Sequence, residues 1–483
     1  MNRKAKIVAT LGPASQDETV LEQLIAAGVN VARLNFSHGT HDEHAGRIET
    51  IRRVSGKMGV PVGILQDLQG PKIRVGQLNA PVQLSEGAVV TLYATGTTPP
   101  ANAETRIPVD FHQIFDSVQP SDRLLLDDGR LALDVVSVQG DALQAKVRVG
   151  GPLTSHKGIN LPGARLRIDS FTTKDQADLA FGMAHGVDAV AISFVRSAAD
   201  VLQVRSAMER LSNGRPVPIL IAKLEKPEAL GDLPAILEVV DGVMVARGDL
   251  GVELPPERVP PLQKTIIQAA NRKAKLVITA TQMLESMIAN PLPTRAEASD
   301  VANAIFDGTD SVMLSAETAS GKYPLQAVQM MHRIVVEAET HLVEWGRDIA
   351  TVQGLEENDA ASMARAAHEL ANDGNVRAVA CFTLRGRSAW LMSKIRPRVP
   401  ILAFTPDQET YSRLSLLWGV TPLLIPYVNS LDQMLRHVDD ALVQTVKPGD
   451  QVVMVCGFPV GAARQPNMAL LHTVGGNAAE SSA

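Results

Sequence analysis

Residues 218–225 read PILIAKLE, and residues 242–251 read GVMVARGDLG. Each segment contains a short run of apolar, largely β-branched residues, which is typical of a buried strand. Each run ends in charged side chains, namely Lys223 and Glu225 in the first segment and Asp249 in the second. Buried strands with reactive groups at their carboxyl ends are typical of parallel α/β enzymes, so these two segments predict that fold.

The same pattern recurs between Lys6 and Glu317, with segments of helical period between most of the runs. About eight such units would close a (β/α)8 TIM barrel, whose active site forms at the carboxyl ends of its strands. The other runs are KIVATLG (6–12), VNVARLNF (29–36), VGILQDL (62–68), AVAISFV (189–195), LVITATQ (276–282) and SVMLSAE (311–317). The polar groups near the ends of the runs are Arg33, Asn35, Ser37, Asp67, Ser193, Lys223, Glu225, Asp249, Thr281 and Glu317.

Two regions depart from the barrel pattern. Between Gly70 and Ile168 the sequence changes to alternating strands broken by turns, with Asp128-Gly129 as one hairpin signal. After Glu339, short apolar runs again alternate with helical stretches, which predicts a small open sheet. We therefore expect a barrel formed by residues 1–69 and 169–338, an inserted all-β lid domain, itself a β-barrel, at 70–168, and a C-terminal α/β domain at 339–483.

Composition limits the class of protein. The chain has 483 residues, 45% hydrophobic content and a net charge of -6, which predicts several domains and argues against a basic nucleic-acid-binding face. Its two cysteines, Cys381 and Cys456, lie in apolar runs and are expected to be reduced and buried. The sequence shows neither a signal-peptide pattern nor an apolar run of the roughly 20 residues that a spanning helix needs. We expect a cytoplasmic enzyme with small-molecule partners and without nucleic-acid or membrane partners.

Phosphate binding is predicted from side chains, because the sequence has neither a G-x-x-x-x-G-K-[ST] loop nor a G-x-G-x-x-G turn after a strand. Arg33, Asn35 and Ser37 alternate along one strand, so they face one side of it, into the barrel mouth. An arginine there offers a fork for phosphate. A purely structural hydrogen-bond ladder is the alternative for this string.

A divalent-metal site is predicted from two carboxylates on adjacent strands, Glu225 and Asp249. Such a sparse oxygen site suits Mg²⁺, which keeps several waters and takes further ligands from substrate oxygens. Lys223 beside them would offset developing negative charge. A buried ion-pair network is the alternative. Five groups are individually weak signals, since capping or packing also explains them: His38, Thr281, Arg295, Glu297 and Glu317.

Taken together, these strings resemble the pyruvate kinase family, in its bacterial type with lysine in the GPKIR motif. The resemblance covers nearly the whole barrel in family order, the lid mainly at its edges, and the last region more loosely. The matching motifs are KIVATLGPAS (6–15), NVARLNFSHG (30–39), QDLQGPKIRVG (66–76), HKGINLPG (156–163), AKLEKPEAL (222–230), VMVARGDLGVE (243–253), ITATQMLESM (278–287) and the segment 293–324.

The resemblance implies a phosphotransferase (EC 2.7.1.40) that converts phosphoenolpyruvate and ADP to pyruvate and ATP, the final step of glycolysis. It implies Mg²⁺, with Mn²⁺ as a substitute, held by Glu225 and Asp249. It also implies a homotetramer whose C-terminal domain binds an allosteric activator. By matching positions, the catalytic residues would be Arg33, Lys223 and Thr281, the substrate contacts these three with Gly248 and Asp249, and the nucleotide contacts Asn35, Phe36, Ser37, His38, Arg74 and Lys157.

One departure concerns monovalent cations. Family members that require K⁺ carry glutamate where this chain has Lys72, and Thr-Lys where it has Leu68-Gln69. The resemblance implies a monovalent-cation pocket formed by Asn35, Ser37, Asp67 and the Leu68 carbonyl. We expect the Lys72 ammonium to supply the charge there, so that K⁺ is not required.

A second ligand site is predicted at TLRGRS, where a strand ends in hydroxyl and guanidinium groups before a helix. In the family this position binds a phosphorylated activator, so we expect a sugar phosphate or AMP. The same turn could instead cap the helix. The residues are Thr383, Leu384, Arg385, Gly386, Arg387 and Ser388.

Two other functions are compatible with parts of the pattern. A Mg²⁺-dependent barrel lyase of pyruvate-like substrates would share the two carboxylates but would need no nucleotide lid, and Arg74 and Lys157 argue against it. A metabolite sensor with a dead site is the non-enzymatic alternative. Against it stands the intact set of Lys223, Glu225, Asp249 and Thr281.

Overall fold

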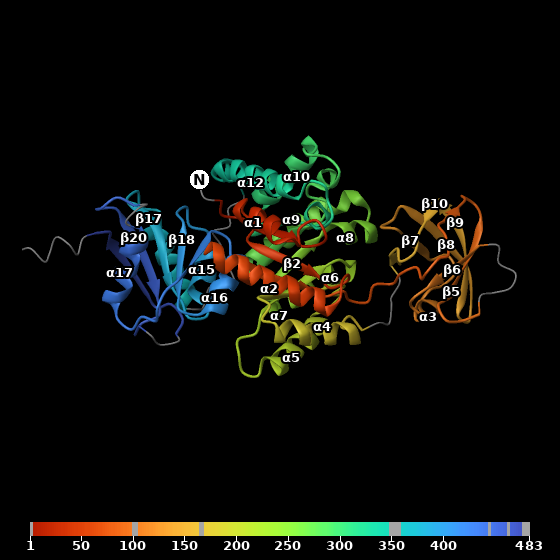
Figure 1. Cartoon of the computed structure of the whole chain (residues 1–483), viewed down its shortest axis with the longest axis horizontal. Helices are drawn as coiled ribbons and strands as arrows, with labels where there is room; N and C mark the ends of the chain where they lie inside the picture. The colour runs from red at the N-terminus through yellow and green to blue at the C-terminus, as the bar shows by residue number, and fades with distance from the viewer. Residues whose placement is uncertain are drawn as a thin grey trace, which may run out of the picture.

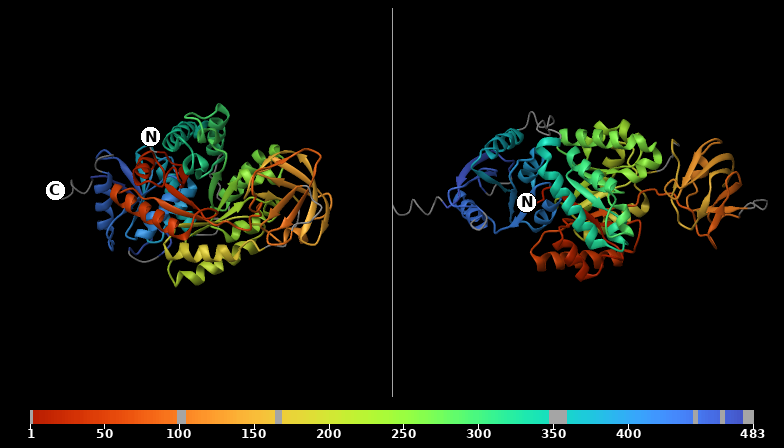
Figure 2. Two further views of the ribbon diagram at one scale, coloured as in Figure 1. Left: turned by 45° about the vertical axis from the view of Figure 1, so that its right-hand side comes forward. Right: turned by 90° about the horizontal axis from the view of Figure 1, so that it is seen from above.

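Three assemblies of secondary structure follow one another along the molecule (Figure 1). The computed structural model describes residues 3–98, 105–163, 169–346, 359–442, 446–460 and 464–475. A parallel barrel lies in the centre, with the strands of residues 82–153 at one end and a C-terminal sheet at the other. The two further views agree with this order (Figure 2).

The central assembly is a closed barrel of eight parallel strands, in the order β1-β16-β15-β14-β13-β12-β3-β2. This confirms the predicted (β/α)8 barrel. Its strands are β1 (Lys6–Thr10), β2 (Val31–Asn35), β3 (Gly63–Asp67), β12 (Ala189–Ile192), β13 (Ile219–Leu224), β14 (Gly242–Ala246), β15 (Leu276–Ala280) and β16 (Ser311–Leu314).

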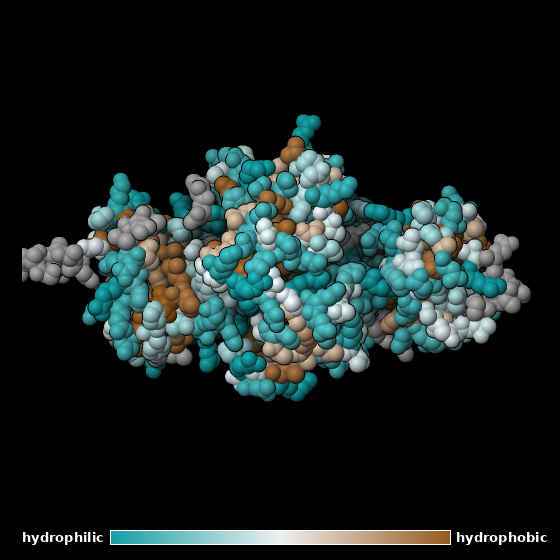
Figure 3. All heavy atoms as spheres, in the orientation of Figure 1, coloured by the Kyte–Doolittle hydropathy of each residue, from teal (hydrophilic) through white to brown (hydrophobic). Residues whose placement is uncertain are grey.

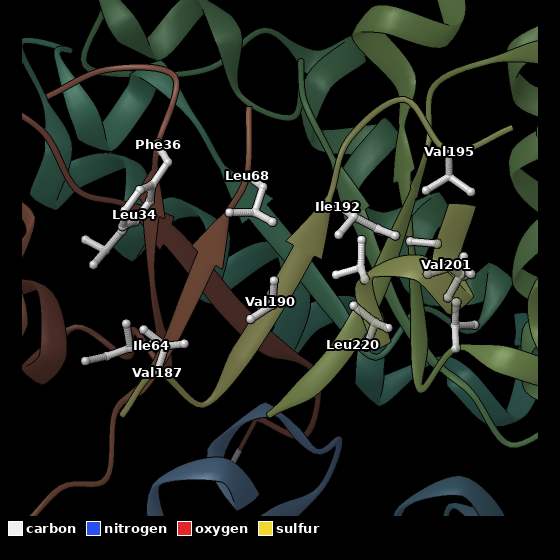
Figure 4. Close-up of a cluster of buried hydrophobic side chains, with 14 of the residues drawn as sticks. Leu34, Phe36, Ile64, Leu68, Val187, Val190, Ile192, Val195, Val201 and Leu220 are labelled. Carbon is white, nitrogen blue, oxygen red and sulfur yellow. The ribbon is translucent and has the colours of Figure 1, made fainter. Parts of the chain in front are cut away.

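Strand alternation decides which residues reach the barrel interior. Leu34, Ile64, Val190 and Leu220 come from four neighbouring strands and pack in the core cluster between the strands and the outer helices (Figure 4). Because successive side chains of a strand point to opposite faces, Arg33 next to Leu34 points into the barrel. The same alternation carries the polar strand ends to the interior.

The outer helices begin at recognisable caps. In α2 and α10, Thr40 and Thr294 accept a hydrogen bond from the backbone of the third helical residue, whose glutamate side chain bonds back to the cap. The principal outer helices are α1 (Glu18–Ala26), α2 (His41–Met58), α4 (Thr173–Ala184), α5 (Ala198–Ser212), α7 (Leu233–Val239), α9 (Val259–Arg272), α10 (Arg295–Asp307) and α12 (Pro324–Thr340). Shorter helices are α6 (Pro227–Gly231), α8 (Arg247–Glu253), α11 (Ala316–Ala319) and α13 (Leu342–Trp345), with 3-10 turns η1 (Pro256–Arg258) and η2 (Glu285–Ile288).

The chain leaves the barrel after β3 and forms the second assembly. It consists of a six-stranded sheet, β11-β7-β8-β9-β5-β6, and a two-stranded sheet, β10-β4. The predicted hairpin at Asp128-Gly129 is confirmed by the antiparallel pairing of β7 with β8. The strands are β4 (Val82–Leu84), β5 (Val89–Ala94), β6 (Arg106–Val109), β7 (Arg123–Leu126), β8 (Leu131–Gln139), β9 (Ala142–Val149), β10 (Gly151–Leu153) and β11 (Ile159–Asn160), with one helical turn, α3 (Ile114–Ser117).

The third assembly is a five-stranded sheet in the order β19-β18-β17-β20-β21, parallel except for β21. It confirms the predicted C-terminal α/β fold. Its strands are β17 (Val376–Phe382), β18 (Ile401–Thr405), β19 (Val420–Leu424), β20 (Gln451–Cys456) and β21 (Met468–Thr473), and its helical segments are α14 (Asp359–Ala371), α15 (Arg387–Ile395), α16 (Gln408–Arg413), η4 (Leu414–Leu416) and α17 (Leu431–Leu442). Both cysteines are buried and unpaired there, as predicted.

The amino ends of the barrel strands face this C-terminal assembly. The Lys394 ammonium on α15 lies 2.7 Å from Asp310 Oδ2 just before β16, and both side chains are fully buried. Trp390 donates its indole N–H to the Ala274 carbonyl before β15. The carboxyl ends of the strands therefore lie on the opposite side of the barrel, where the chain enters the inserted strands.

The molecular surface in Figure 3 is mostly hydrophilic, with an apolar strip over the C-terminal assembly. No helix in the described part of the chain is long and apolar enough to cross a bilayer.

Candidate active site

Lys223 is the centre of a charged cluster at the carboxyl ends of the barrel strands. Its Nζ lies 2.8 Å from Glu225 Oε1 and 3.2 Å from Asp67 Oδ1, and donates to Ser193 Oγ over 2.7 Å. Burial lowers the pKa of Lys223, but the attraction of Asp67 and Glu225, and more weakly of Asp249, outweighs burial, so the net pKa is raised. Lys223 is thus a fixed positive charge at neutral pH.

Arg33 and Asp67 form the second buried ion pair of the site. Arg33 Nε lies 2.7 Å from Asp67 Oδ2, and its Nη1 donates to Thr10 Oγ1 over 3.0 Å. Burial raises the pKa of Asp67, but the charges of Lys223 and Arg33 outweigh it and leave the pKa lowered. Asp67 is therefore ionised, and it holds the Arg33 and Lys223 side chains in place at the barrel mouth.

Glu225 and Asp249 supply surplus negative charge. Glu225 Oε2 accepts the backbone N–H of Phe194 over 2.7 Å, and its side chain is almost fully buried. Burial raises the pKa of Glu225, Lys223 partly offsets this, and the charge of Asp249 raises the pKa further. Two carboxylates that repel one another, one of them buried, are a donor set that a divalent cation stabilises.

This donor set fits a sparse metal site. No cluster of three or more His, Cys, Asp or Glu side chains suited to a metal occurs among the described residues, so a closed protein cage is absent from that part of the chain. The cluster at the mouth has two cations, Arg33 and Lys223, against three carboxylates, those of Asp67, Glu225 and Asp249. A hard divalent ion that takes its remaining ligands from waters and substrate fits this balance.

Thr281 has an unusual backbone conformation. Its φ of 65° is in the left-handed region, which β-branched residues rarely adopt. Its hydroxyl accepts the backbone N–H of Gly248 and donates to the Ala280 carbonyl, each over 2.7 Å. A Cβ on Gly248 would lie 3.2 Å from Thr281 Oγ1, so glycine permits this close approach. The hydroxyl and the start of α8 are thereby held together.

Arg247 holds the Thr281 turn through hydrogen bonds to its backbone carbonyls. Its Nη2 donates to the Thr281 carbonyl over 2.7 Å and to the Gln282 carbonyl over 3.2 Å, and its Nη1 pairs with Asp300 Oδ2 over 2.6 Å. The sequence singles out Ser193 as a polar strand end but assigns it no role. Arg247 is not among the predicted site residues, because an arginine that binds carbonyls carries no sequence signal of its own.

The predicted nucleotide residues come from the end of β2 with the turn that follows it, and from the segments that lead into β4 and β11. His38 has a lowered pKa because it is partly buried and because the charges of Arg74, Lys72 and Arg33 disfavour its protonation. These three cations therefore lie near His38. Asn35 Oδ1 accepts the backbone N–H of Ser37 over 3.2 Å. These groups form a basic rim beside the Lys223 cluster.

Three of the predicted nucleotide contacts, Phe36, Arg74 and Lys157, already have partners within the protein. The Phe36 side chain is buried in the core, stacked on His44 with ring centroids 4.0 Å apart, and its backbone N–H donates to the Asp67 carbonyl while its own carbonyl accepts from Lys174. Arg74 donates to the His156 carbonyl, and Lys157 pairs with Asp127 over 2.7 Å. Arg74 lies between β3 of the barrel and β4, and Lys157 lies between β10 and β11.

Lys72 does not pair with Asp67, whose two oxygens are taken by Arg33 and Lys223. Its side chain instead approaches Gly158 in the lid. The Leu68 carbonyl accepts the Ser193 hydroxyl over 2.7 Å. Among the residues of the predicted monovalent-cation pocket, Asp67 is thus paired with Arg33 and Lys223 rather than with Lys72.

Glu297 and Glu317 have structural partners. Glu297 accepts hydrogen bonds from Ser286 and Thr294, and Glu317 accepts the backbone N–H groups of Leu284 and Ser315. These contacts agree with the capping alternative for both residues.

A cavity of about 220 Å³ lies at the predicted effector residues in the C-terminal assembly. Gly386, with φ 84°, precedes the first turn of α15. The predicted residues that line the cavity are Thr383, Leu384, Arg385, Arg387 and Ser388.

Comparison with known proteins gives consistent matches over nearly the whole chain. The family model described as the pyruvate kinase barrel domain matches residues 2–328, and the model of the pyruvate kinase alpha/beta domain matches residues 361–472. Curated relatives named pyruvate kinase include one from Agrobacterium vitis, 45% identical over 96% of this chain and 97% of its own length. Two others are from Geobacillus stearothermophilus, 44% identical over 98% of this chain and 81% of the relative, and from Mycobacterium tuberculosis, 43% identical over 98% and 99%.

Proposed function

The chain belongs to the pyruvate kinase family and transfers the phosphoryl group of phosphoenolpyruvate to ADP, and we propose that Lys223, Arg33 and the Glu225–Asp249 pair carry this transfer. The observation that carries the proposal is the buried cluster in which Lys223 lies 2.8 Å from Glu225 and 3.2 Å from Asp67. Phosphoryl transfer depends mainly on positioning and charge neutralisation, which such a cluster supplies.

The family uses a divalent metal, and Glu225 and Asp249 would hold it in this chain, with Mg²⁺ as the ion and Mn²⁺ as a substitute. When bound, the ion supplies positive charge to the oxygens of the substrate and of the transferring phosphoryl group. Burial and the charge of Asp249 raise the pKa of Glu225, so the ionised form of Glu225 is disfavoured. A bound divalent ion would stabilise the ionised Glu225 and Asp249 together. Glu225→Gln should raise the metal concentration needed for half-maximal activity, and an unchanged requirement would remove Glu225 from this role.

Arg33 and Lys223 would bind the phosphoryl oxygens. An oxygen of the ADP β-phosphate attacks phosphorus while the bond from phosphorus to the enol oxygen breaks, and Lys223 stabilises the negative charge that develops on that oxygen. The enolate carbon then takes a proton to give pyruvate. Thr281 through a water is our proposed route for that proton, since its hydroxyl lies at the start of α8 beside Gly248.

The nucleotide would bind along the basic rim. Asn35, Ser37 and His38 lie beside Arg33, and the backbone of Phe36 continues the same turn. Arg74 and Lys157 approach from the lid segments, where Lys157 would exchange Asp127 for a nucleotide phosphate. A lid that carries these two cations would bring them over the mouth when it moves.

We propose that the enzyme needs no K⁺. Support comes from Asp67, the carboxylate of the predicted pocket, which is already paired with Arg33 and Lys223, and from Lys72, whose charge acts on the neighbouring His38. Activity should be similar in potassium, sodium or tetramethylammonium salts at equal ionic strength. The matched variant Lys72→Glu should acquire a dependence on K⁺. Strong dependence of the wild type on K⁺ would contradict the proposal.

Regulation and assembly are also proposals. The cavity at 383–388 fits a phosphorylated activator, a sugar phosphate or AMP, because Arg385 and Arg387 reach it. We propose that the enzyme is cytoplasmic and forms a homotetramer. Sedimentation of the purified chain would test the tetramer. The lyase and the dead sensor are not favoured, because the family and its named relatives share the kinase activity.

A further inference from the structure

The turn after β2, formed by residues 36–38, is bonded to side chains of two outer helices. The Phe36 carbonyl accepts a hydrogen bond from the Lys174 ammonium on α4, over 2.7 Å. At the other end of the turn, the His38 carbonyl lies 2.9 Å from Nε2 of His44 on α2. The backbone carbonyls at both ends of this turn are thus fixed from the helical layer of the barrel.

The Lys174 ammonium is itself held in a defined position. Its Nζ lies 2.6 Å from Oδ2 of Asp178, one helical turn later, whose side chain is almost fully buried. Asp178 Oδ1 lies 2.7 Å from His41 Nε2, and the Asp178 backbone carbonyl accepts the side-chain amide of Gln66 on β3 over 2.6 Å. Lys174 therefore reaches the turn from a fixed carboxylate, although its own side chain is half exposed.

The stability of α4 does not account for a lysine at this position. Lys174 is the second residue of the helix, where the macrodipole disfavours positive charge. A lysine four residues before an aspartate is also the less favourable order for a helical ion pair. The helix already begins with a capping box formed by Thr172 and Asp175. What the lysine adds at this position is its bond to the Phe36 carbonyl.

The next residue of α4, Asp175, holds both connections of the lid. Its Oδ1 accepts the backbone N–H of Gly70, where the chain leaves the barrel, over 3.0 Å. Its Oδ2 accepts the hydroxyl of Thr172, which caps the first helix after the lid, over 2.6 Å. A Cβ on Gly70 would lie 2.8 Å from the Phe194 ring, so the chain leaves through a narrow passage. One helical turn therefore fixes the turn 36–38 and the two lid connections relative to one another.

We propose that Lys174 is a positioning residue for the nucleotide, acting through the backbone of the turn 36–38 and not by contact with the nucleotide. This inference rests on the proposed nucleotide contacts of that turn. Without the ammonium, the Phe36 carbonyl loses its charged donor, and the turn occupies the binding conformation for only a fraction of the time. The apparent affinity falls by that fraction, whereas the chemical step in the filled site is unchanged.

Steady-state kinetics of Lys174→Met test the inference. The KM for ADP should rise about fivefold, the effect of one net hydrogen bond, while kcat and the KM for phosphoenolpyruvate stay within about twofold. Lys174→Arg keeps a charged donor and should recover most of the affinity. The matched control is Lys264→Met on α9, which follows β14 on the far side of the barrel from β2. Lys264 is 38% exposed and pairs with a buried aspartate, Asp307, as Lys174, 50% exposed, pairs with Asp178.

Two further variants keep the test decisive. The double variant Lys174→Met with Asp178→Asn leaves no unpaired buried carboxylate, so it should fold even if the single variant does not, and should show the same rise in KM. His38→Ala tests the nucleotide contact itself. A raised KM for ADP in His38→Ala with a wild-type KM in the folded Lys174 variants would overturn this inference alone. A wild-type KM in all of them would remove the nucleotide contact and the inference together, and an equal rise in Lys264→Met would also overturn the inference.

Discussion

At the residue scale, Thr281 combines a β-branched side chain with a left-handed backbone. Such a conformation costs of order 1–3 kcal/mol and persists because the surroundings hold it. Here Arg247 binds the Thr281 and Gln282 carbonyls, while Gly248 donates to the hydroxyl. The strain places a hydroxyl at the amino end of α8, beside Asp249, where the proposed reaction needs it.

This account predicts opposite effects of glycine at two threonines. Thr281→Gly should be more stable than Thr281→Ala by about 1 kcal/mol, because glycine adopts positive φ without strain. Both variants should lose about a hundredfold in kcat if the hydroxyl serves proton transfer. At Thr50 inside α2, alanine should instead be more stable than glycine. Urea unfolding gives the stabilities, and a Thr281→Gly variant less stable than Thr281→Ala would contradict the strain.

Individual residues show where sequence reasoning succeeds and fails. Alternation along β2 correctly sends Arg33 inward, but the same rule sends Phe36 to the core side, where it stacks on His44. Its assignment as a nucleotide contact rested on resemblance rather than on strand geometry. The position of Lys72 depends on how the lid joins the barrel, a long-range contact that no local pattern encodes.

At the scale of elements, the lid is tied to the barrel through Glu253 at the end of α8. Its Oε1 accepts Asn160 Nδ2 of β11 over 3.2 Å and lies 2.6 Å from Lys226 Nζ, just before α6. One buried carboxylate thus joins a lid strand to two barrel helices. Because the lid segments carry Arg74 and Lys157, we expect this contact to affect nucleotide binding more than the chemical step.

Glu253→Gln should therefore raise the KM for ADP by about fivefold, since one net hydrogen bond is worth about 1 kcal/mol, with a smaller change in kcat. The matched control is Asp134→Asn, which alters a lid carboxylate that pairs with Arg123 and Arg148 away from the barrel. Steady-state kinetics measure both constants. A selective fall in kcat with KM unchanged would show that Glu253 acts on chemistry instead.

The elements themselves were predictable where both faces of a strand are buried. Runs such as those at 219–224 and 242–246 become barrel strands because apolar residues fill the interior and the helix-facing side alike. The short helix α8 was not predicted. Its sequence, RGDLGVE, has two glycines and no apolar stripe, and it is stabilised by tertiary contacts such as that of Arg247 with Asp300.

At the scale of the whole molecule, the barrel and the C-terminal assembly meet through buried charge. Lys394 pairs with Asp310, and Lys6 at the start of β1 donates to the Val420 carbonyl over 2.7 Å. Burial lowers the pKa of Lys6 to about 7, with a further lowering by Arg3 that Glu339 partly opposes. A charged Lys6 therefore destabilises the folded chain at low pH.

The pH dependence of Lys6→Met tests this contact. Between about pH 7 and the ordinary lysine pKa, the unfolded chain binds more protons at this site than the folded chain, so the destabilisation by Lys6 declines as pH rises. The gain in Tm of Lys6→Met over wild type should be largest near pH 6 and shrink by pH 9. The control Lys146→Met should show no such trend, and a gain that grows with pH would contradict the lowered pKa.

The central claim concerns the whole turnover, and Lys223→Met tests it most directly. Pyruvate formation from phosphoenolpyruvate and ADP is measured in a coupled assay, with Lys57→Met on the outer surface as control. Loss of the fixed charge should lower kcat by about a thousandfold, the scale of a lost transition-state contact, with the KM for phosphoenolpyruvate changed only a few-fold. A folded Lys223→Met variant with kcat within tenfold of wild type would contradict the account.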